Sequence, residues 1–143
     1  MGVGDDAAAA GTDVRKVDLV GMTRAHIADP HIVAKMMRGE EDRIRPCVGA
    51  GYCIDRIYVG GDALCVHNPA TGRERTMPHV IARGDGPSRR VVVIGGGPAG
   101  LEAARVSALR GHEVRLYEAS DRLGGQVNLA ARLERRREII GIT

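Results

Sequence analysis

The sequence predicts an α/β fold whose best-defined part is a strand–helix–strand unit in the C-terminal half. Residues 91–94 (VVVI) are consecutive β-formers and favour a buried strand. A glycine cluster and a helical segment, residues 101–110, follow, and a second strand, residues 114–117, ends at Glu118. Strand, tight turn, helix and strand in this order are typical of a βαβ unit with parallel strands.

The glycine cluster between the first strand and the helix fits the pattern G-x-G-x-x-G. Gly95 permits a tight turn, Gly97 lets the backbone approach a pyrophosphate, and Gly100 lets the helix pack closely on the strand. Glu118 would accept hydrogen bonds from ribose hydroxyls, and its charge disfavours the 2′-phosphate of NADP. The alternative is a glycine-rich turn that only packs a strand against a helix. The predicted nucleotide-binding residues are Gly95, Gly96, Gly97, Pro98, Ala99, Gly100 and Glu118.

Composition excludes several classes of protein. The chain has 143 residues, 43% of them hydrophobic and 27% charged, which is typical of one compact globular domain. Its net charge of +3 arises from basic residues that alternate with acids, and with no Phe or Trp it lacks stacking platforms for nucleic acid. No apolar stretch reaches the ~18 residues of a membrane span. An odd number of cysteines without an export signal indicates a cytoplasmic protein.

The N-terminal region combines an aperiodic leader with a short apolar segment. Residues 1–15 are small and polar, which predicts disorder, and residues 17–22 (VDLVGM) resemble a buried strand closed by glycine. Asp29 and Pro30 are suited to begin a helix, and Gly39 is placed to end it. The apolar side chains of that helix would share one face: Ile32, Val33, Met36 and Met37.

Three cysteines lie close together in an irregular, glycine-rich segment. Cys47, Cys53 and Cys65 fall within 19 residues of one another. Closely spaced thiolates on such backbone are typical of iron–sulfur clusters. With His67 as a fourth ligand the same cysteines could hold zinc. The remaining alternative is three reduced thiols without a metal.

The C-terminal third of the chain resembles the two-dinucleotide-binding flavoproteins, on the residues VVVIGGGPAGLEAA and VRLYEASDRLGGQ. The resemblance implies that the glycine turn holds the ADP half of FAD, or alternatively ADP or NAD. It also implies that Gly125 and Gln126, in the Gly-Gly segment after Glu118, lie near the flavin. The alternative for Gly124 and Gly125 is an ordinary loop turn.

The segment PCVGAGYCIDRIYVGGDALCVHNP, with GMTRAHIADP before it and NPATGRE after it, resembles the trimethylamine dehydrogenase and 2,4-dienoyl-CoA reductase family. That family joins an FMN-binding barrel to a nucleotide-binding domain, with a [4Fe–4S] cluster between them. The resemblance implies that Cys47, Cys53 and Cys65 are the first, third and fourth cluster ligands, and Ala50 stands where the second belongs. A three-iron cluster, a non-cysteine ligand (Asp55 or His67) or no cluster are the alternatives this leaves.

The resemblance also implies that the segment VGMTR follows the last barrel strand, with Arg24 binding the FMN phosphate. The alternative is a surface arginine beside a helix. The implied fold is therefore the last strand and helix of a TIM barrel, a cysteine-rich loop and the first βαβ unit of a Rossmann-like domain. The expected segments are a leader, barrel remnant, cysteine loop, linker and nucleotide-binding start, at residues 1–15, 16–45, 46–73, 74–89 and 90–143.

The function expected from these features is that of a fragment of a flavin-dependent oxidoreductase, acting on amine or enoyl-type substrates. The resemblance implies that in the intact family electrons pass between FMN in the barrel, the iron–sulfur cluster and FAD or ADP in the nucleotide domain. Because most of the barrel and the second half of the nucleotide domain are expected to lie outside the chain, no catalytic residue is nominated and the fragment alone is expected to be inactive. The alternatives are a stand-alone adenine-dinucleotide-binding module and a zinc-clipped interaction protein.

Overall fold

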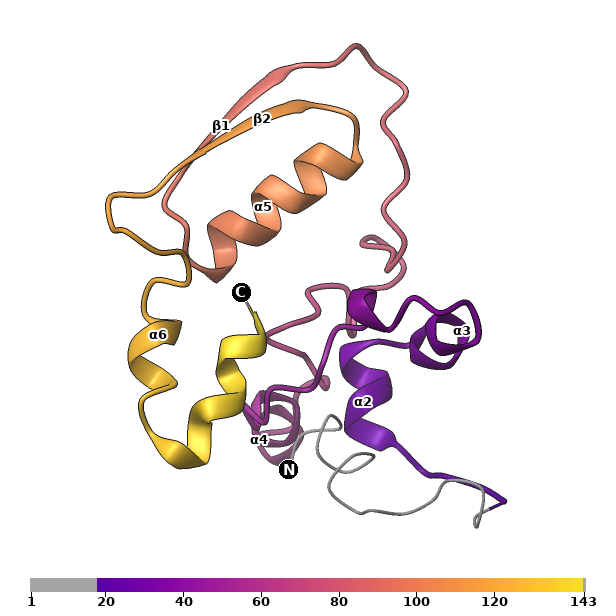
Figure 1. Cartoon of the computed structure of the whole chain (residues 1–143). Coiled ribbons are helices and arrows are strands. Elements are labelled where there is room, and N and C mark those ends of the chain that lie inside the picture. The colour runs from indigo at the N-terminus through magenta and orange to yellow at the C-terminus, as the bar shows by residue number, and fades with distance from the viewer. Residues whose placement is uncertain (1–17, 143) are drawn as a thin grey trace. The chain divides into compact units, whose positions relative to one another are not determined.

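The computed structural model describes residues 18–142, which form two compact units that divide between His79 and Val80 (Figure 1). Each unit is described by itself. The leader expected at residues 1–15 lies outside the described residues. Within residues 18–142, no helix is long and apolar enough to cross a membrane.

The first unit is built from short helices and loops. Its elements are α2 (Thr23–Ala28), α3 (Ile32–Met37), the 3-10 turn η2 (Glu41–Arg43) and α4 (Tyr52–Tyr58). A helix is present after Asp29 as predicted, but α3 begins at Ile32 with His31 as its N-cap, so Asp29 and Pro30 precede the helix instead of beginning it. α3 ends at Met37, and Gly39 follows two residues later with a φ of +67°, a conformation that favours glycine, as expected for the residue that ends the helix.

Two expectations for the start of this unit are wrong. Residues 18–22 form no strand, and Leu19 and Val20 are 92% and 61% exposed. A single strand has no ladder partner to satisfy its backbone, and the described residues supply none here. Of the four apolar side chains expected on one face of α3, only Ile32 is buried, and Met37 is 84% exposed.

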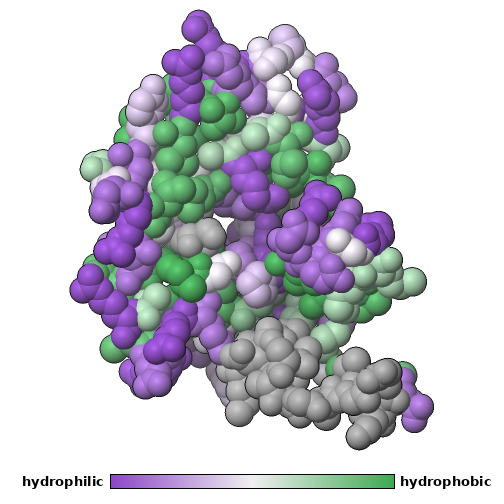
Figure 2. Space-filling view, in the orientation of Figure 1, coloured by the Kyte–Doolittle hydropathy of each residue, from purple (hydrophilic) through white to green (hydrophobic). Residues whose placement is uncertain are grey.

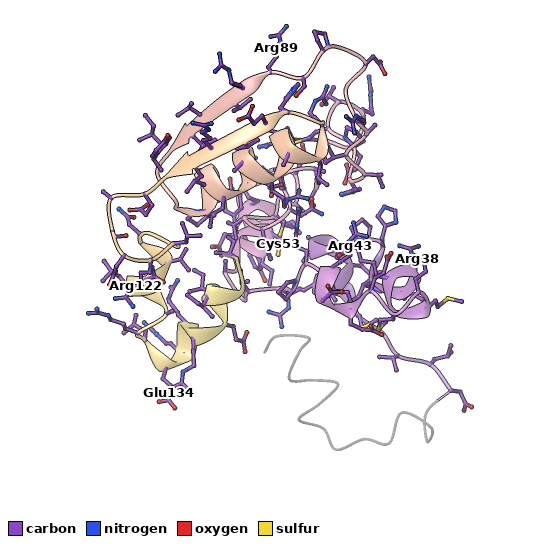
Figure 3. All side chains as sticks on the ribbon, turned by 45° about the horizontal axis from the view of Figure 1, so that its top comes forward. Arg38, Arg43, Cys53, Arg89, Arg122 and Glu134 are labelled. Carbon is purple, nitrogen blue, oxygen red and sulfur yellow. The ribbon has the colours of Figure 1, made fainter. Side chains whose placement is uncertain are left out.

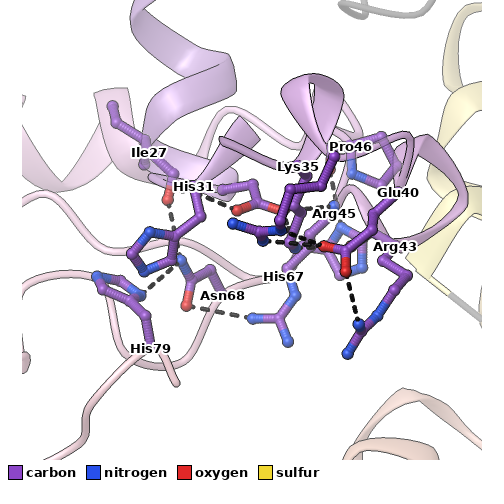
Figure 4. Close-up of polar contacts among 12 residues, drawn as sticks. Ile27, His31, Lys35, Glu40, Arg43, Arg45, Pro46, His67, Asn68 and His79 are labelled. Carbon is purple, nitrogen blue, oxygen red and sulfur yellow. Dashed lines mark hydrogen bonds and ion pairs between the residues drawn. The ribbon is translucent and has the colours of Figure 1, made fainter. Parts of the chain in front are cut away.

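The core of the first unit is small and partly polar. Its buried apolar residues are Ala25, Ala28, Ile32, Val48 and Ala70. Asn68 is 2% exposed, and its side chain joins three segments that are distant in sequence (Figure 4). The Asn68 Nδ2 atom donates to the Ile27 carbonyl oxygen at 3.3 Å and lies 3.2 Å from His79 Nδ1, while its Oδ1 accepts from Arg45 at 3.2 Å.

Asp29 is a second buried hydrogen-bonding centre in this unit. Its carboxylate accepts from the backbone N–H of His31 at 3.0 Å and of Arg45 at 2.9 Å, and it pairs with the ammonium of Lys35. Burial raises the pKa of Asp29, but the hydrogen bonds from Arg45, Lys35 and His31 outweigh it, so the pKa lies below its ordinary value. Asp29 and Asn68 thus fix the segment that leads into the cysteine loop.

The second unit contains the predicted βαβ arrangement. Its elements are β1 (Arg90–Ile94), α5 (Pro98–Leu109), β2 (Glu113–Tyr117), α6 (Val127–Ala130) and the 3-10 segment η3 (Glu134–Ile142). The two strands pair in parallel, from Arg90 opposite Glu113 to Ile94 opposite Tyr117, and α5 lies along one face of the pair (Figure 1). The expected strand–helix–strand order is therefore confirmed. The helix begins three residues earlier than predicted, because Pro98 occupies its first turn.

Burial alternates along both strands. In β1 the side chains of Val91 and Val93 are half-buried, whereas Val92 and Ile94 are 60% and 87% exposed. In β2, Tyr117 is 56% exposed. Apolar residues accordingly reach the molecular surface (Figure 2). Parallel sheets are normally covered on both faces. In this pair, α5 covers one face, and the side chains of Val92 and Ile94 are exposed.

Candidate dinucleotide-binding turn and cysteine pocket

The turn after β1 has the geometry that its glycines predict. Gly95 has a φ of +100°, in the left-handed region that disfavours other residues. Its N–H donates to the Tyr117 carbonyl oxygen at 2.8 Å, so the turn begins directly at the end of the parallel ladder. The chain then reverses into α5 within three residues, at the carboxyl edge of the strands, where open α/β sheets bind ligands.

Gly100 is the point at which α5 meets the turn. A Cβ atom built on Gly100 would lie 1.9 Å from the Gly95 carbonyl oxygen and 3.4 Å from Cγ1 of Val93. The distance to the carbonyl oxygen leaves no room for a methyl group, whereas the distance to Val93 is an ordinary van der Waals contact. Because glycine has no side chain, the N-terminus of α5 can pack directly against the end of β1.

Gly97 faces open space instead. A Cβ atom on it would meet no heavy atom within 4 Å, and its φ of −75° suits any residue. Folding therefore does not require glycine at this position. Glycine is required there only if something outside the chain must lie against the backbone.

The N-terminus of α5 is suited to an anion. No side chain caps it, and the first helical hydrogen bond runs from Leu101 N–H to the Gly97 carbonyl oxygen at 2.9 Å. The N–H groups of Ala99 and Gly100 precede that bond and point out of the helix end, while Pro98 carries no N–H. These donors and the helix dipole together favour a phosphate group.

Glu118 lies beside the same turn. One oxygen of its carboxylate accepts from the Gly96 N–H at 2.6 Å, and the other accepts from the Ser120 N–H at 2.9 Å. The backbone N–H of Ser120, that of Gly96 and the Ser120 hydroxyl lower the pKa of Glu118 to about 2. Because a carboxylate has about four lone-pair positions, it can still accept from a ribose hydroxyl.

A second glycine loop packs on the first. The Gly124 N–H donates to the Gly96 carbonyl oxygen at 2.8 Å, and a Cβ atom on Gly125 would lie 3.3 Å from the Gly97 Cα. Both glycines have positive φ, at +108° and +51°. The structure thus brings Gly125 next to the predicted phosphate turn, while Gln126 is exposed at the start of α6.

The three cysteines line one pocket of the first unit. Cys47 and Cys65 come from loops, and Cys53, labelled in Figure 3, lies on α4. All three are half-buried free thiols. The other residues that line the pocket come mainly from the loop before α4 and the first residue of α4. They are Arg24, Val48, Gly49, Ala50, Gly51, Tyr52 and Val66. The three thiols therefore line one pocket, and one of them lies on a helix that the sequence did not predict.

The donors in this pocket do not complete a metal site. His67 and Asp55 are not among its lining residues: the His67 Nδ1 is 2.8 Å from the Pro46 carbonyl oxygen, and Asp55 is exposed. Among residues 18–142, no three His, Cys, Asp or Glu side chains gather closely enough for one metal ion. The zinc alternative, with three cysteines and His67, is therefore wrong for this structure.

A cluster ligated by four protein thiolates does not fit the pocket either. The pocket wall contains three thiols, and Ala50, which also lines it, has a methyl group that cannot bind iron. The side chains present therefore cannot hold a [4Fe–4S] cluster on four cysteines.

Both halves of the chain are similar to known proteins. A model of the NAD(P)-binding Rossmann-like domain matches residues 93–138. N,N-dimethylglycine/sarcosine dehydrogenase of Chromohalobacter salexigens is 64% identical over 89% of this chain and 18% of its own length. Dimethylamine dehydrogenase of Hyphomicrobium sp. is 36% identical over 82% of this chain and 16% of its own. The structure of histamine dehydrogenase from Rhizobium sp. 4-9 matches with a TM-score of 0.86 and 33% identity, over 96% of this chain and 20% of that one.

The named relatives belong to the trimethylamine dehydrogenase and 2,4-dienoyl-CoA reductase family, and the chain is similar to one part of them. It spans about a fifth of the length of the relatives it matches. The resemblance seen in the glycine and cysteine motifs is thereby confirmed. The match to the Rossmann-like domain fits a dinucleotide or flavin cofactor at the glycine turn.

Two features of the site were missed from sequence. The helix α4 carries Cys53, and the i, i+4 pairs Cys53–Ile57 and Ile54–Tyr58 were the signal for it. Arg24, expected only at an FMN phosphate, also lines the cysteine pocket. Nothing in the sequence around Arg24 indicates that neighbour, because it depends on how α2 meets the loop after Pro46.

Proposed function

We propose that this chain supplies the adenine-nucleotide site of a flavin-dependent oxidoreductase that acts on amine or enoyl-type substrates, with FAD at the turn after β1. The observation that carries the proposal is the contrast between two glycines. Gly100 is required by packing, because a Cβ atom on it would lie 1.9 Å from the Gly95 carbonyl oxygen, whereas no contact among residues 18–142 requires glycine at position 97. A backbone kept bare toward open space at a helix N-terminus is suited to a pyrophosphate.

In the proposed complex the chain binds and orients, and the chemistry comes from the cofactor. The N–H groups at the N-terminus of α5 donate to the diphosphate, and Gly97 leaves the space that the diphosphate needs. Glu118, already fixed by Gly96 and Ser120, accepts from the adenosine ribose and repels a 2′-phosphate. Gly125, packed on Gly97, places the second loop beside the diphosphate. A bound flavin supplies hydride and electron transfer.

Amine substrates are favoured by the names of the relatives. The dehydrogenases for N,N-dimethylglycine and sarcosine, dimethylamine and histamine all carry amine substrates in their names, and 2-naphthoyl-CoA reductase represents the enoyl side. The first of these is 64% identical to the chain. We therefore place the substrate class with small N-methylated amines, which the remaining four-fifths of such an enzyme would bind.

The N-terminal half extends the proposal toward a second flavin. We propose that residues 16–45 correspond to the end of an FMN-binding barrel and that Arg24 serves the FMN phosphate, with residues 46–73, 74–89 and 90–143 as the cysteine loop, the linker and the nucleotide-binding start. The support is the family and the fixed charge of arginine, which binds phosphate oxygens through a planar fork of donors.

The test is calorimetric titration of the whole 143-residue chain with FAD, ADP and NAD. We expect FAD and ADP to bind, and Gly97→Val to weaken them at least tenfold, because its side chain fills the space of the diphosphate. The matched control is Gly86→Val, since a Cβ on Gly86 also meets nothing within 4 Å but lies in the linker. Circular dichroism checks that both variants are folded. The proposal fails if none of the three nucleotides binds, or if Gly97→Val binds as tightly as Gly86→Val.

A further inference from the structure

We infer that Ala50 makes the cysteine pocket a three-thiolate site, in which a fourth iron has no protein ligand and does not stay bound unless a thiolate is restored at position 50. This inference concerns the first unit and does not depend on the nucleotide site. It rests on which side chains line the pocket and which do not.

The pocket gathers three thiols from separate parts of the loop region. Cys47, Cys53 and Cys65 all contribute to its wall, although they span 19 residues and include one helix position. Three soft sulfur donors around one cavity are suited to iron–sulfur chemistry rather than to hard cations. Each thiol would release its proton to solvent on binding iron.

The loop at Ala50 has the shape of a ligand loop without the ligand. Ala50 lies between Gly49 and Gly51, which have φ of +63° and +76°, so the backbone curls around this position. Gly51 then starts α4, and its carbonyl oxygen accepts from the N–H of Ile54 at 2.9 Å and of Asp55 at 3.0 Å. Ala50 is part of the pocket wall, and its side chain is a methyl group that cannot bind iron.

Within residues 18–142, no other side chain of the pocket wall replaces the missing donor. His67 and Asp55, the nearest oxygen and nitrogen donors in sequence, are both absent from the pocket wall. The other polar side chains in the wall are those of Tyr52 and Arg24, and Arg24 is a fixed cation that repels iron. An arginine at this place instead offsets part of the negative charge of a thiolate-bound cluster.

The test is anaerobic reconstitution of the whole chain with ferric iron, sulfide and a dithiol reductant, followed by analysis of iron and acid-labile sulfide per chain. Electron paramagnetic resonance is then recorded after oxidation with ferricyanide and after reduction with dithionite. We expect three or fewer irons per natural chain, and any cluster formed to be paramagnetic in its oxidised state, as three-iron clusters are. Ala50→Cys is expected to bind four irons and to give a cluster that is diamagnetic when oxidised and paramagnetic when reduced. Ala50 has an ordinary negative φ, so cysteine fits its backbone.

The control is Ala63→Cys, which adds a thiol to the same loop outside the pocket wall and should leave the iron content of the natural chain unchanged. Cys65→Ala should lower that content where the natural chain binds iron. The inference is wrong if the natural chain retains four irons, if Ala50→Cys binds no more iron than the natural chain, or if Ala63→Cys raises the iron content as much as Ala50→Cys.

Discussion

Replacing Gly100 by alanine should force α5 away from the end of β1. The added methyl carbon would lie 1.9 Å from the Gly95 carbonyl oxygen, and non-bonded carbon and oxygen atoms essentially never approach closer than 3.0 Å. The obstacle is backbone on both sides, so no flexible side chain can yield. The helix must therefore shift by roughly 1 Å, which also weakens its contact with Val93.

The cost follows from overpacking, which typically amounts to about 1–3 kcal/mol. Alanine regains up to about 1 kcal/mol through its higher helix propensity, so we expect a net loss of about 1–2 kcal/mol in the free energy of unfolding. For a unit of this size that lowers Tm by roughly 4–15 °C.

Thermal unfolding followed by circular dichroism measures this loss. Gly86→Ala serves as the control, because it makes the same chemical change at a glycine whose Cβ would meet nothing. If Gly100→Ala unfolds at the same temperature as Gly86→Ala, or higher, the close approach at Gly95 does not exist in solution. The explanation of this glycine by packing would then be wrong.

Three further changes test the charged and polar centres. Glu118→Gln should weaken FAD binding about tenfold, because a charge-assisted hydrogen bond is lost. The loss should be equal at pH 7 and pH 5, because the pKa of about 2 keeps Glu118 ionised at both. A loss seen at one pH alone would contradict this explanation. Asp29→Asn should destabilise the chain at pH 7 by about 1–3 kcal/mol in urea unfolding. Because the pKa of Asp29 is lowered in the folded state, its contribution to the free energy of unfolding is present above about pH 4 and is lost as the pH falls through the folded value. The free energies of unfolding of the variant and the natural chain should therefore converge in acid. A difference that stays constant with pH would rule out this linkage. Asn68→Ala should lower the free energy of unfolding by about 1–3 kcal/mol, because the Ile27 carbonyl oxygen and the Arg45 guanidinium lose a buried hydrogen-bond partner. An unchanged midpoint of urea unfolding would show that water replaces the amide at no cost.

The βαβ unit was predictable because its signals are local. Two runs of β-formers, glycines at fixed positions and an acid at the second strand end each act within a few residues, and they agree with one another. The position of α5 relative to Gly95 and the contact between the two glycine loops follow from the same glycines. The hydrogen bond from Gly96 N–H to Glu118 did not follow, because it depends on the rotamer of one side chain.

The first unit was less predictable because its elements depend on distant partners. The segment 17–22 has the composition of a strand, but a strand forms only where a neighbouring strand satisfies its backbone. Helix α2, from Thr23 to Ala28, is too short to be stable by propensity. It is held at its C-terminal end by Asn68 and Thr71, which donate to the Ile27 carbonyl oxygen from more than 40 residues away. Such contacts leave no periodic pattern in the sequence.

The buried amide of Asn68 has a consequence for how the first unit responds to temperature. Heat-capacity increments on unfolding come from apolar area exposed to water, and polar groups reduce them. The centre of this unit consists of three alanines, one isoleucine, one valine, a carboxylate, an amide and a threonine, so it exposes little hydrocarbon when it opens. Its stability curve is accordingly shallow, with a gradual thermal transition and little loss of stability in the cold.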